Sequence, residues 1–444
     1  MNETKPTTGL RRRLGLFDAT MIVMGGIIGS GIFMNPSVVA KVISSPLLIM
    51  AAWAAGGLIA LMGAFVYAEL SSQRSEAGGQ YAYLREAFHP AVAFIYGWAL
   101  LLVIQTGGMA AVAITFAKYF LELAQRPATD LNTALVAIIA LGSLTVINCL
   151  GVRAGSTVQS ILMVLKIVAI AGLVVFGLTV PNSHAVFESG GHGPGGISAW
   201  TAFGAAMIPV LFAYGGWQTS CFIAGEVRDP KRDLPRALLL GVLGVIAIYL
   251  AVNYVCLRVL GAEGLAATQT PASAVMRLAF GEIGGRLIAI GIAISTLGFL
   301  SQSILTAPRV YFAMAEDGLF FRSVARLSSR HVPVVAIILQ GVMAMIIALS
   351  GKYEQILNYV VTVDFIFFGL TATCIFVFRL RTRDKTGFRI PGHPVSTILF
   401  ILACWIVVGN VVYSYPRNSL IGLAIMASGL PVYYLWRRQK RSTE

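Results

Sequence analysis

Long apolar runs alternate with short polar segments along the whole chain. The longest polar segment, about 181–199, is rich in Gly, Pro and Ser, and no segment is long enough to form a soluble domain. A helix needs about 20 apolar residues to cross a bilayer. Twelve runs reach that length, near 17–40, 46–70, 91–118, 131–150, 156–180, 200–225, 237–260, 285–315, 332–350, 355–379, 395–414 and 419–436. The pattern predicts an all-α integral membrane protein with 12 transmembrane helices.

The composition supports a surface that faces lipid. Of the 444 residues, 57% are hydrophobic and 12% are charged, whereas a soluble domain is about 25% charged. So few charges could not cover a soluble surface, so most of the surface must contact the lipid bilayer.

The net charge of +14 reflects topology. In a soluble protein such an excess would suggest nucleic acid, but here the basic residues lie between apolar runs, and we expect no nucleic-acid partner. With the N-terminus inside, the inner segments hold 24 of the 33 Lys and Arg residues and the outer segments hold 8. This bias predicts a multi-pass protein of the cell (inner) membrane with both termini cytoplasmic.

Cysteines and histidines give no sign of a metal site. The histidines read as loop or helix-end residues, and the cysteines form no CxxC pair, so we expect the cysteines to pack in the core and expect no metal and no cofactor. The first apolar run also lacks the cleavage site of a secretory signal peptide. The cysteines are Cys149, Cys221, Cys256, Cys374 and Cys404.

Two apolar runs are interrupted at matching places. The first contains the glycine-rich segment 25–31, and the sixth contains the segment 212–217. An offset of five spans means that the second copy crosses the membrane in the opposite direction, as in an inverted repeat. We therefore expect repeat one over 17–180, repeat two over 200–379 and two added helices over 395–436, with cytoplasmic tails at 1–16 and 437–444.

Unwound segments expose backbone groups that suit a zwitterion. Amide groups at the start of a half-helix favour a carboxylate, and freed carbonyl groups favour an ammonium group. The same glycines would also permit close helix packing, but the matched pair of breaks favours a binding site at the midplane. The predicted substrate-binding residues are Ile27, Gly29, Ser30, Gly31, Phe212, Ala213 and Gly215.

Aromatic side chains flank the second break. Phe212 directly precedes the predicted unwound segment, and Trp217 follows it. Both could simply pack in the core; the functional interpretation is a gate over the substrate, with Phe212 as the first candidate.

One lysine and three acids lie in or near apolar runs. Lys166 is about ten residues from either end of the fifth run, where a charge is costly and usually functional. Glu69 and Glu226 fall at helix ends, which favours a solvated or ion-paired role. Asp364 lies deeper, and the sequence assigns it no role.

Six segments resemble the amino acid–polyamine–organocation (APC) superfamily of transporters, and most of all its L-type amino acid transporter branch. The resemblance covers nearly the full length. It rests on 25–33 (GGIIGSGIF), 76–84 (EAGGQYAYL), 148–153 (NCLGVR), 212–217 (FAYGGW), 225–236 (GEVRDPKRDLPR) and 305–318 (LTAPRVYFAMAEDG). It implies a leucine-transporter-type fold of 5+5 inverted repeats, alternating access, and sodium-independent transport of amino acids, often as exchange.

The resemblance also implies roles for particular residues. The amides of Ser30 and Gly31 would hold the substrate carboxylate, the carbonyls of Ile27 and Phe212 would take the amine, and Phe212 would be the gate. Sodium symporters of this fold hold a cation between the first and eighth spans, beside the fifth. Lys166 would supply that charge permanently, as a cation-site surrogate, by donating to carbonyls near Gly25 and Gly26.

Animal members of the branch pair with a glycoprotein through an extracellular cysteine. This chain has no cysteine in its expected outer loops, so we expect no obligatory accessory subunit. The predicted function is sodium-independent exchange of neutral L-amino acids and not an enzymatic reaction. Two alternatives stay open: a proton-coupled amino acid symporter, and an exchanger of cationic amino acids or polyamines.

Overall fold

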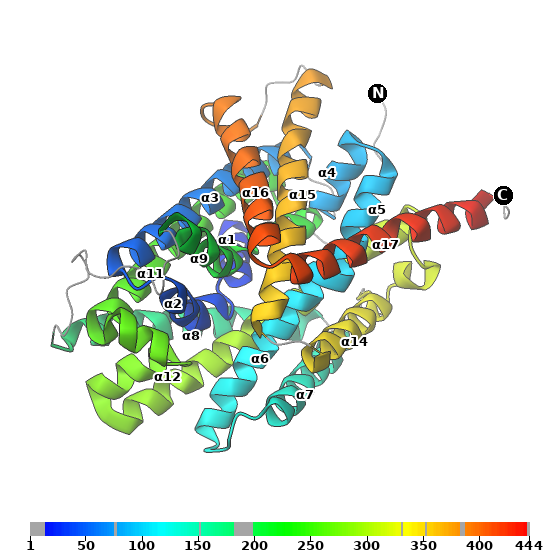
Figure 1. The fold of residues 1–444 in the computed structure, drawn as a ribbon. Coiled ribbons are helices and arrows are strands. Elements are labelled where there is room, and N and C mark those ends of the chain that lie inside the picture. The colour runs from blue at the N-terminus through cyan, green and yellow to red at the C-terminus, as the bar shows by residue number, and fades with distance from the viewer. Residues whose placement is uncertain are drawn as a thin grey trace.

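The computed structural model describes residues 14–74, 78–150, 152–181, 199–329, 332–350, 353–381 and 387–441, with side chains except at 152–161, 199, 350 and 438–441. Within these ranges the regular structure is helical (Figure 1), apart from one isolated parallel bridge between Leu14 and Val227. The α-helices of the first half are α1 (Leu16–Ile27), α2 (Gly31–Val42), α3 (Pro46–Gln73), α4 (Gln80–Ala87), α5 (Pro90–Ala99), α6 (Gln105–Leu123), α7 (Asp130–Cys149), α8 (Val152–Thr179), α9 (Ala199–Tyr214) and α10 (Thr219–Phe222).

The second half is built in the same way. Its α-helices are α11 (Pro230–Ala267), α12 (Pro271–Thr306), α13 (Pro308–Glu316), α14 (Val334–Ser350), α15 (Tyr353–Arg381), α16 (Val395–Ser414) and α17 (Pro416–Arg441). A π-helix, η1 (Leu100–Ile104), joins α5 to α6, and the 3₁₀-helices are η3 (Ala224–Glu226) and η4 (Arg322–Ala325).

Ten helical stretches in the described part of the chain are long and apolar enough to cross a membrane. The all-α membrane class is thus confirmed, while the count of 12 spans is not. The ninth expected span is the shorter apolar helix Val334–Leu349. The sixth is absent from the ten because its helix, α9, stops at Tyr214, inside the expected span.

The outer helices present apolar side chains outward, as lipid contact requires. On α7, for example, Leu131, Ile139 and Val146 are 68%, 65% and 61% exposed, while Leu141 is fully buried. Similar exposed apolar side chains lie on α8, α12, α16 and α17. Because a soluble protein rarely exposes so much apolar surface, these helices form the lipid-facing wall.

Helices that are distant in the sequence pack against each other at the centre. Helix α1 packs on α11, and α2 packs on α9, so the two broken spans lie side by side within the bundle (Figure 1). Helix α12 packs along α8 and α6, and α15 packs along α16. The broken helices are therefore enclosed, and their freed backbone groups face protein rather than lipid.

Ion pairs tie several helix ends together. Glu69 is fully buried and accepts two hydrogen bonds from Arg379, each 2.7 Å long, together with one from the backbone N–H of Ile390. Glu226 pairs with Arg309 at 3.2 Å. The expected ion-paired role of both acids is confirmed.

The cysteines pack as expected. Cys149 is partly buried and the other four are buried. Among the described residues, no group of three or more His, Cys, Asp or Glu side chains is placed to hold a metal ion.

Candidate substrate site

Both predicted interruptions are confirmed in position. Helix α1 ends at Ile27 and α2 begins at Gly31, and residues 28–30 between them are not helical. Helix α9 ends at Tyr214, and α10 begins at Thr219. Glycine permits such breaks because it adopts conformations that other residues avoid, and Gly216 has a φ of 108°.

The two breaks touch each other. A Cβ atom on Gly216 would lie 2.0 Å from the carbonyl oxygen of Gly26, and a Cβ atom on Gly31 would lie 2.5 Å from the Cα atom of Ala213. Close packing therefore does explain these two glycines. It also brings the exposed backbone of both breaks to one place.

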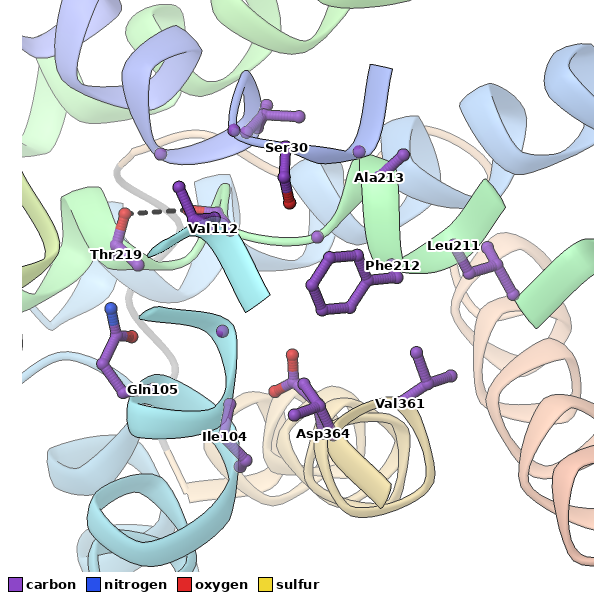
Figure 2. A pocket seen from close by; sticks show the side chains of 18 of the residues that line it. Ser30, Ile104, Gln105, Val112, Leu211, Phe212, Ala213, Thr219, Val361 and Asp364 are labelled. Carbon is purple, nitrogen blue, oxygen red and sulfur yellow. Dashed lines mark hydrogen bonds between the residues drawn. The ribbon is translucent and has the colours of Figure 1, made fainter. Parts of the chain in front are cut away.

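A pocket with a cavity of about 70 Å³ opens at this place. Segments of α1, α2, α6, α9, α10, α12 and α15 and of both breaks line it. All seven predicted substrate-binding residues are among the lining residues; Trp217 is not. Figure 2 shows the hydroxyl of Ser30 and the ring of Phe212 on one side, with Val361 and Asp364 of α15 across from Ser30.

The start of α2 offers free donors. The backbone N–H groups of Ser30 and Gly31 donate to no group in the described part of the chain, since the first N–H groups of a helix lack an intrahelical acceptor. They lie at the positive end of the α2 dipole. This arrangement suits an anionic group such as a carboxylate.

The freed carbonyl groups are already in part engaged. The Ile27 carbonyl accepts from the Gly29 N–H at 2.8 Å, and the Phe212 carbonyl accepts from the Gly215 N–H at 3.2 Å. The hydroxyl of Tyr249, in α11, lies 3.1 Å from both the Ile27 and the Ala213 carbonyl oxygens. The Tyr249 hydroxyl can donate its single proton to only one of these two carbonyls at a time. The other carbonyl can then accept a hydrogen bond from another donor.

The two candidate gate residues lie in different surroundings. The Phe212 ring lines the pocket and meets the Tyr353 ring edge-on, with centroids 6.3 Å apart. Trp217 is 1% exposed and stacks on Phe368 of α15, with centroids 4.8 Å apart. Phe212 therefore faces the pocket, whereas Trp217 packs away from it.

A buried chain of hydrogen bonds starts at Ser30. Its hydroxyl lies 3.5 Å from the hydroxyl of Tyr353, which donates to the Asn35 side chain at 2.9 Å. Asn35 in turn donates to the Pro209 carbonyl at 2.5 Å. The chain links α2, α15 and α9 beside the pocket.

Lys166 reaches the first break from α8. It is fully buried, and its Nζ donates to the Ile28 carbonyl at 2.5 Å. The expected partners, carbonyls near Gly25 and Gly26, were wrong, because Ile28 lies in the unwound segment where the helix no longer uses its carbonyl. Gln302 of α12 donates to the Ile22 carbonyl at 2.7 Å, so α8 and α12 both hold the first broken helix.

Sequence reasoning missed several pocket residues. Ile104 ends the π-helix η1, Gln105 begins α6, and both line the pocket, in keeping with the frequent placement of π-bulges at functional sites. The sequence places Asp364 deep in a span but does not predict that it lines the pocket. The glycine pair Gly107–Gly108 beside Gln105 was the only local signal in that span.

Comparison with known proteins identifies the family. The family model described as "Amino acid permease" matches residues 14–433. The "Serine/threonine exchanger SteT" of Bacillus subtilis is 33% identical over 444 residues, covering 98% of this chain and 99% of that protein. The "b(0,+)-type amino acid transporter 1" of Mus musculus is 30% identical, over 97% of this chain and 89% of its own length.

A third relative extends the similarity to a human transporter. The "Large neutral amino acids transporter small subunit 2" of Homo sapiens is 29% identical, over 96% of this chain and 80% of its own length. The matches along the chain and the paired helix breaks both indicate an amino acid transporter. The chain belongs to the amino acid permease family of the APC superfamily, and is a membrane transporter and not an enzyme.

Proposed function

We propose that the protein exchanges neutral L-amino acids across the membrane without sodium, by alternating access. The observation that carries the proposal is the pocket between the two helix breaks, into which free backbone N–H groups open while Lys166 holds the adjacent unwound segment. The name of the Bacillus subtilis relative describes an exchanger of serine and threonine, which supports both exchange and neutral substrates.

The backbone of the breaks would recognise what all amino acids share. The N–H groups of Ser30 and Gly31 bind the carboxylate, with Gly29 giving the close approach. The carbonyls of Ile27 and Phe212 accept from the ammonium group. Tyr249 would assist in binding the ammonium group. Its hydroxyl donates to either the Ile27 or the Ala213 carbonyl, so the other carbonyl stays free to accept.

Phe212 would serve as the gate. Its ring lies over the pocket beside Tyr353, so a small movement of α9 changes access to the bound substrate. Trp217 would act with it as a support, because its contact with Phe368 links the second break to α15.

Lys166 would replace a transported cation. Its Nζ donates to the Ile28 carbonyl in the first break, and α8, which carries Lys166, packs along α12. A permanent ammonium at this place would leave sodium no vacant site, and the transport cycle would be independent of the sodium gradient.

The proposal includes an arrangement in the membrane. Residues 17–180 and 200–379 form the two inverted repeats, and 395–436 adds two helices. The tails 1–16 and 437–444, which lie largely outside the described residues, are cytoplasmic, and the protein lies in the cell (inner) membrane. It works without an obligatory accessory subunit, since no cysteine lies in the expected outer loops.

The test is counterflow in liposomes that contain the purified protein. The liposomes are preloaded with unlabelled alanine, and uptake of labelled alanine is followed while external amino acids compete. Neutral amino acids should compete, and uptake should collapse when the liposomes are empty. Uptake of equal size without internal amino acid would contradict exchange, and stronger competition by cationic amino acids or polyamines would favour the cationic exchanger.

Proton-coupled symport is the second candidate. It is favoured by a specific observation, the presence of two titratable groups within the spans, Lys166 beside the pocket and Asp364 in its wall. Under this alternative one of them would change its charge during the cycle. Accumulation of alanine driven by an inward proton gradient, without internal substrate, would support it.

A further inference from the structure

Asp364 is a buried acid that no ion pair neutralises in the described part of the chain. It is 8% exposed, and its Oδ1 atom has no hydrogen-bond partner among the described residues. Three acids near the ends of spans behave differently, since each pairs with an arginine: Glu69 with Arg379, Glu122 with Arg277 and Glu226 with Arg309. A buried carboxylate without a partner is costly. A hydrogen-bond donor on a bound substrate would lower that cost.

The carboxylate faces the substrate pocket. In Figure 2 it points from α15 toward the ring of Phe212, across the cavity from Ser30. The lining residues Ile104, Val361 and Phe365 are apolar, and the other polar side chains of the pocket, Gln105, Gln218 and Thr219, lie on α6, the second break and α10. A donor on a bound molecule would therefore find Asp364 as the acceptor on this side.

We infer that Asp364 accepts a hydrogen bond from the end of the substrate's side chain, so that the pocket selects small amino acids carrying a side-chain hydroxyl over their hydrocarbon isosteres. The assignment depends on the proposed function, in which the two breaks bind the ammonium and carboxylate groups. With those groups held near Ser30 and Phe212, only the side chain is left to reach α15.

The size of the cavity sets the class of side chain. A cavity of about 70 Å³ has room for roughly five to seven water-sized groups, at about 10–15 Å³ each. A cavity of this size suits a short side chain better than an aromatic one. The preferred substrate is thus a short hydroxy amino acid.

Threonine and valine test the inference because they have the same shape and differ by one hydroxyl group. Both compete against counterflow of labelled alanine, which has neither group, in liposomes that contain the full-length protein. A hydrogen bond to the carboxyl group of Asp364 predicts that threonine competes at a concentration about 3- to 10-fold lower than valine.

Variants of Asp364 separate recognition from packing. Asp364→Leu removes the acceptor while keeping the branched shape of the side chain, and should reduce the preference for threonine over valine to less than about threefold. Asp364→Asn keeps one acceptor oxygen and should retain part of the preference. If Asp364→Leu does not fold, the wild-type ratio and the Asp364→Asn variant still decide the question.

The opposing results are distinct. Equal competition by threonine and valine at the wild-type protein, with alanine counterflow intact, overturns the role of Asp364 and leaves the proposed function standing. An equal loss for both competitors in Asp364→Leu also overturns it, since packing alone would then explain the residue. If no amino acid exchanges at all, the proposed function itself fails.

Discussion

Replacing Lys166 with methionine removes the ammonium group while keeping most of the side-chain volume. The lost contact is the bond from Nζ to the Ile28 carbonyl, 2.5 Å long and fully buried. A hydrogen bond with a charged donor contributes about 1.5–3 kcal/mol, which corresponds to a factor of about 10 to 150 in an equilibrium. The unwound segment 28–30 would be less stable in its present conformation by that free energy. The exchange rate should therefore fall by one to two orders of magnitude.

The assay is alanine counterflow in liposomes, with thermal unfolding in detergent measured in parallel. Gln302→Met is the matched control, because it removes a neutral tether of the same broken helix, the 2.7 Å bond to the Ile22 carbonyl. A neutral hydrogen bond contributes about 0.5–1.5 kcal/mol, so this variant should lose less than about tenfold. Wild-type exchange by a well-folded Lys166→Met protein would refute the reasoning.

Substitutions at three further positions, Phe212, Tyr249 and Gly216, probe the breaks. Phe212→Ala should slow exchange by roughly tenfold while substrate binding changes less, because closure over the ligand is lost; Phe212→Trp should be milder, and wild-type exchange by Phe212→Ala would mean that the ring only packs. Tyr249→Phe should weaken alanine binding, measured by calorimetry, by about 2- to 10-fold, because the hydroxyl no longer holds the Ile27 and Ala213 carbonyls of the two breaks in position; unchanged affinity would contradict the bridging role. Gly216→Ala should prevent stable folding, seen as aggregation in size-exclusion chromatography, because its Cβ atom would lie 2.0 Å from the Gly26 carbonyl oxygen. Gly409→Ala, where no atom lies within 4 Å, should behave as the wild type.

Much of the site was readable in the sequence because it is made of backbone. Glycine clusters mark where a helix can break, and 25–31 and 212–217 mark both breaks. The seven residues predicted from them all line one pocket. Local sequence carries this information since a break is a local property of the chain.

The contacts that surround the breaks were not readable. Lys166 meets a carbonyl 138 residues away, and Tyr249 meets one 222 residues away. An apolar run shows that a polar side chain is deep, but it does not show which neighbour it faces, and so Asp364 had no role and Lys166 had the wrong partner. The π-helix at 100–104 was equally hidden, because its sequence is uniformly apolar.

The number of spans was the other point beyond the sequence. An apolar run of about 20 residues predicts a span, but it does not show how much helix remains on each side of a break. The sixth run is divided at the predicted break between α9 and the short α10, so neither part is long enough to count as a span.

Net uptake under imposed ion gradients distinguishes sodium-independent exchange from symport. Purified protein in liposomes receives labelled alanine under an inward sodium gradient, an inward proton gradient or neither, each with and without internal alanine. We predict uptake that requires internal alanine and is unchanged by either gradient. Accumulation driven by sodium in empty liposomes would contradict the role of Lys166 as a resident cation, and accumulation driven by protons would replace exchange with symport.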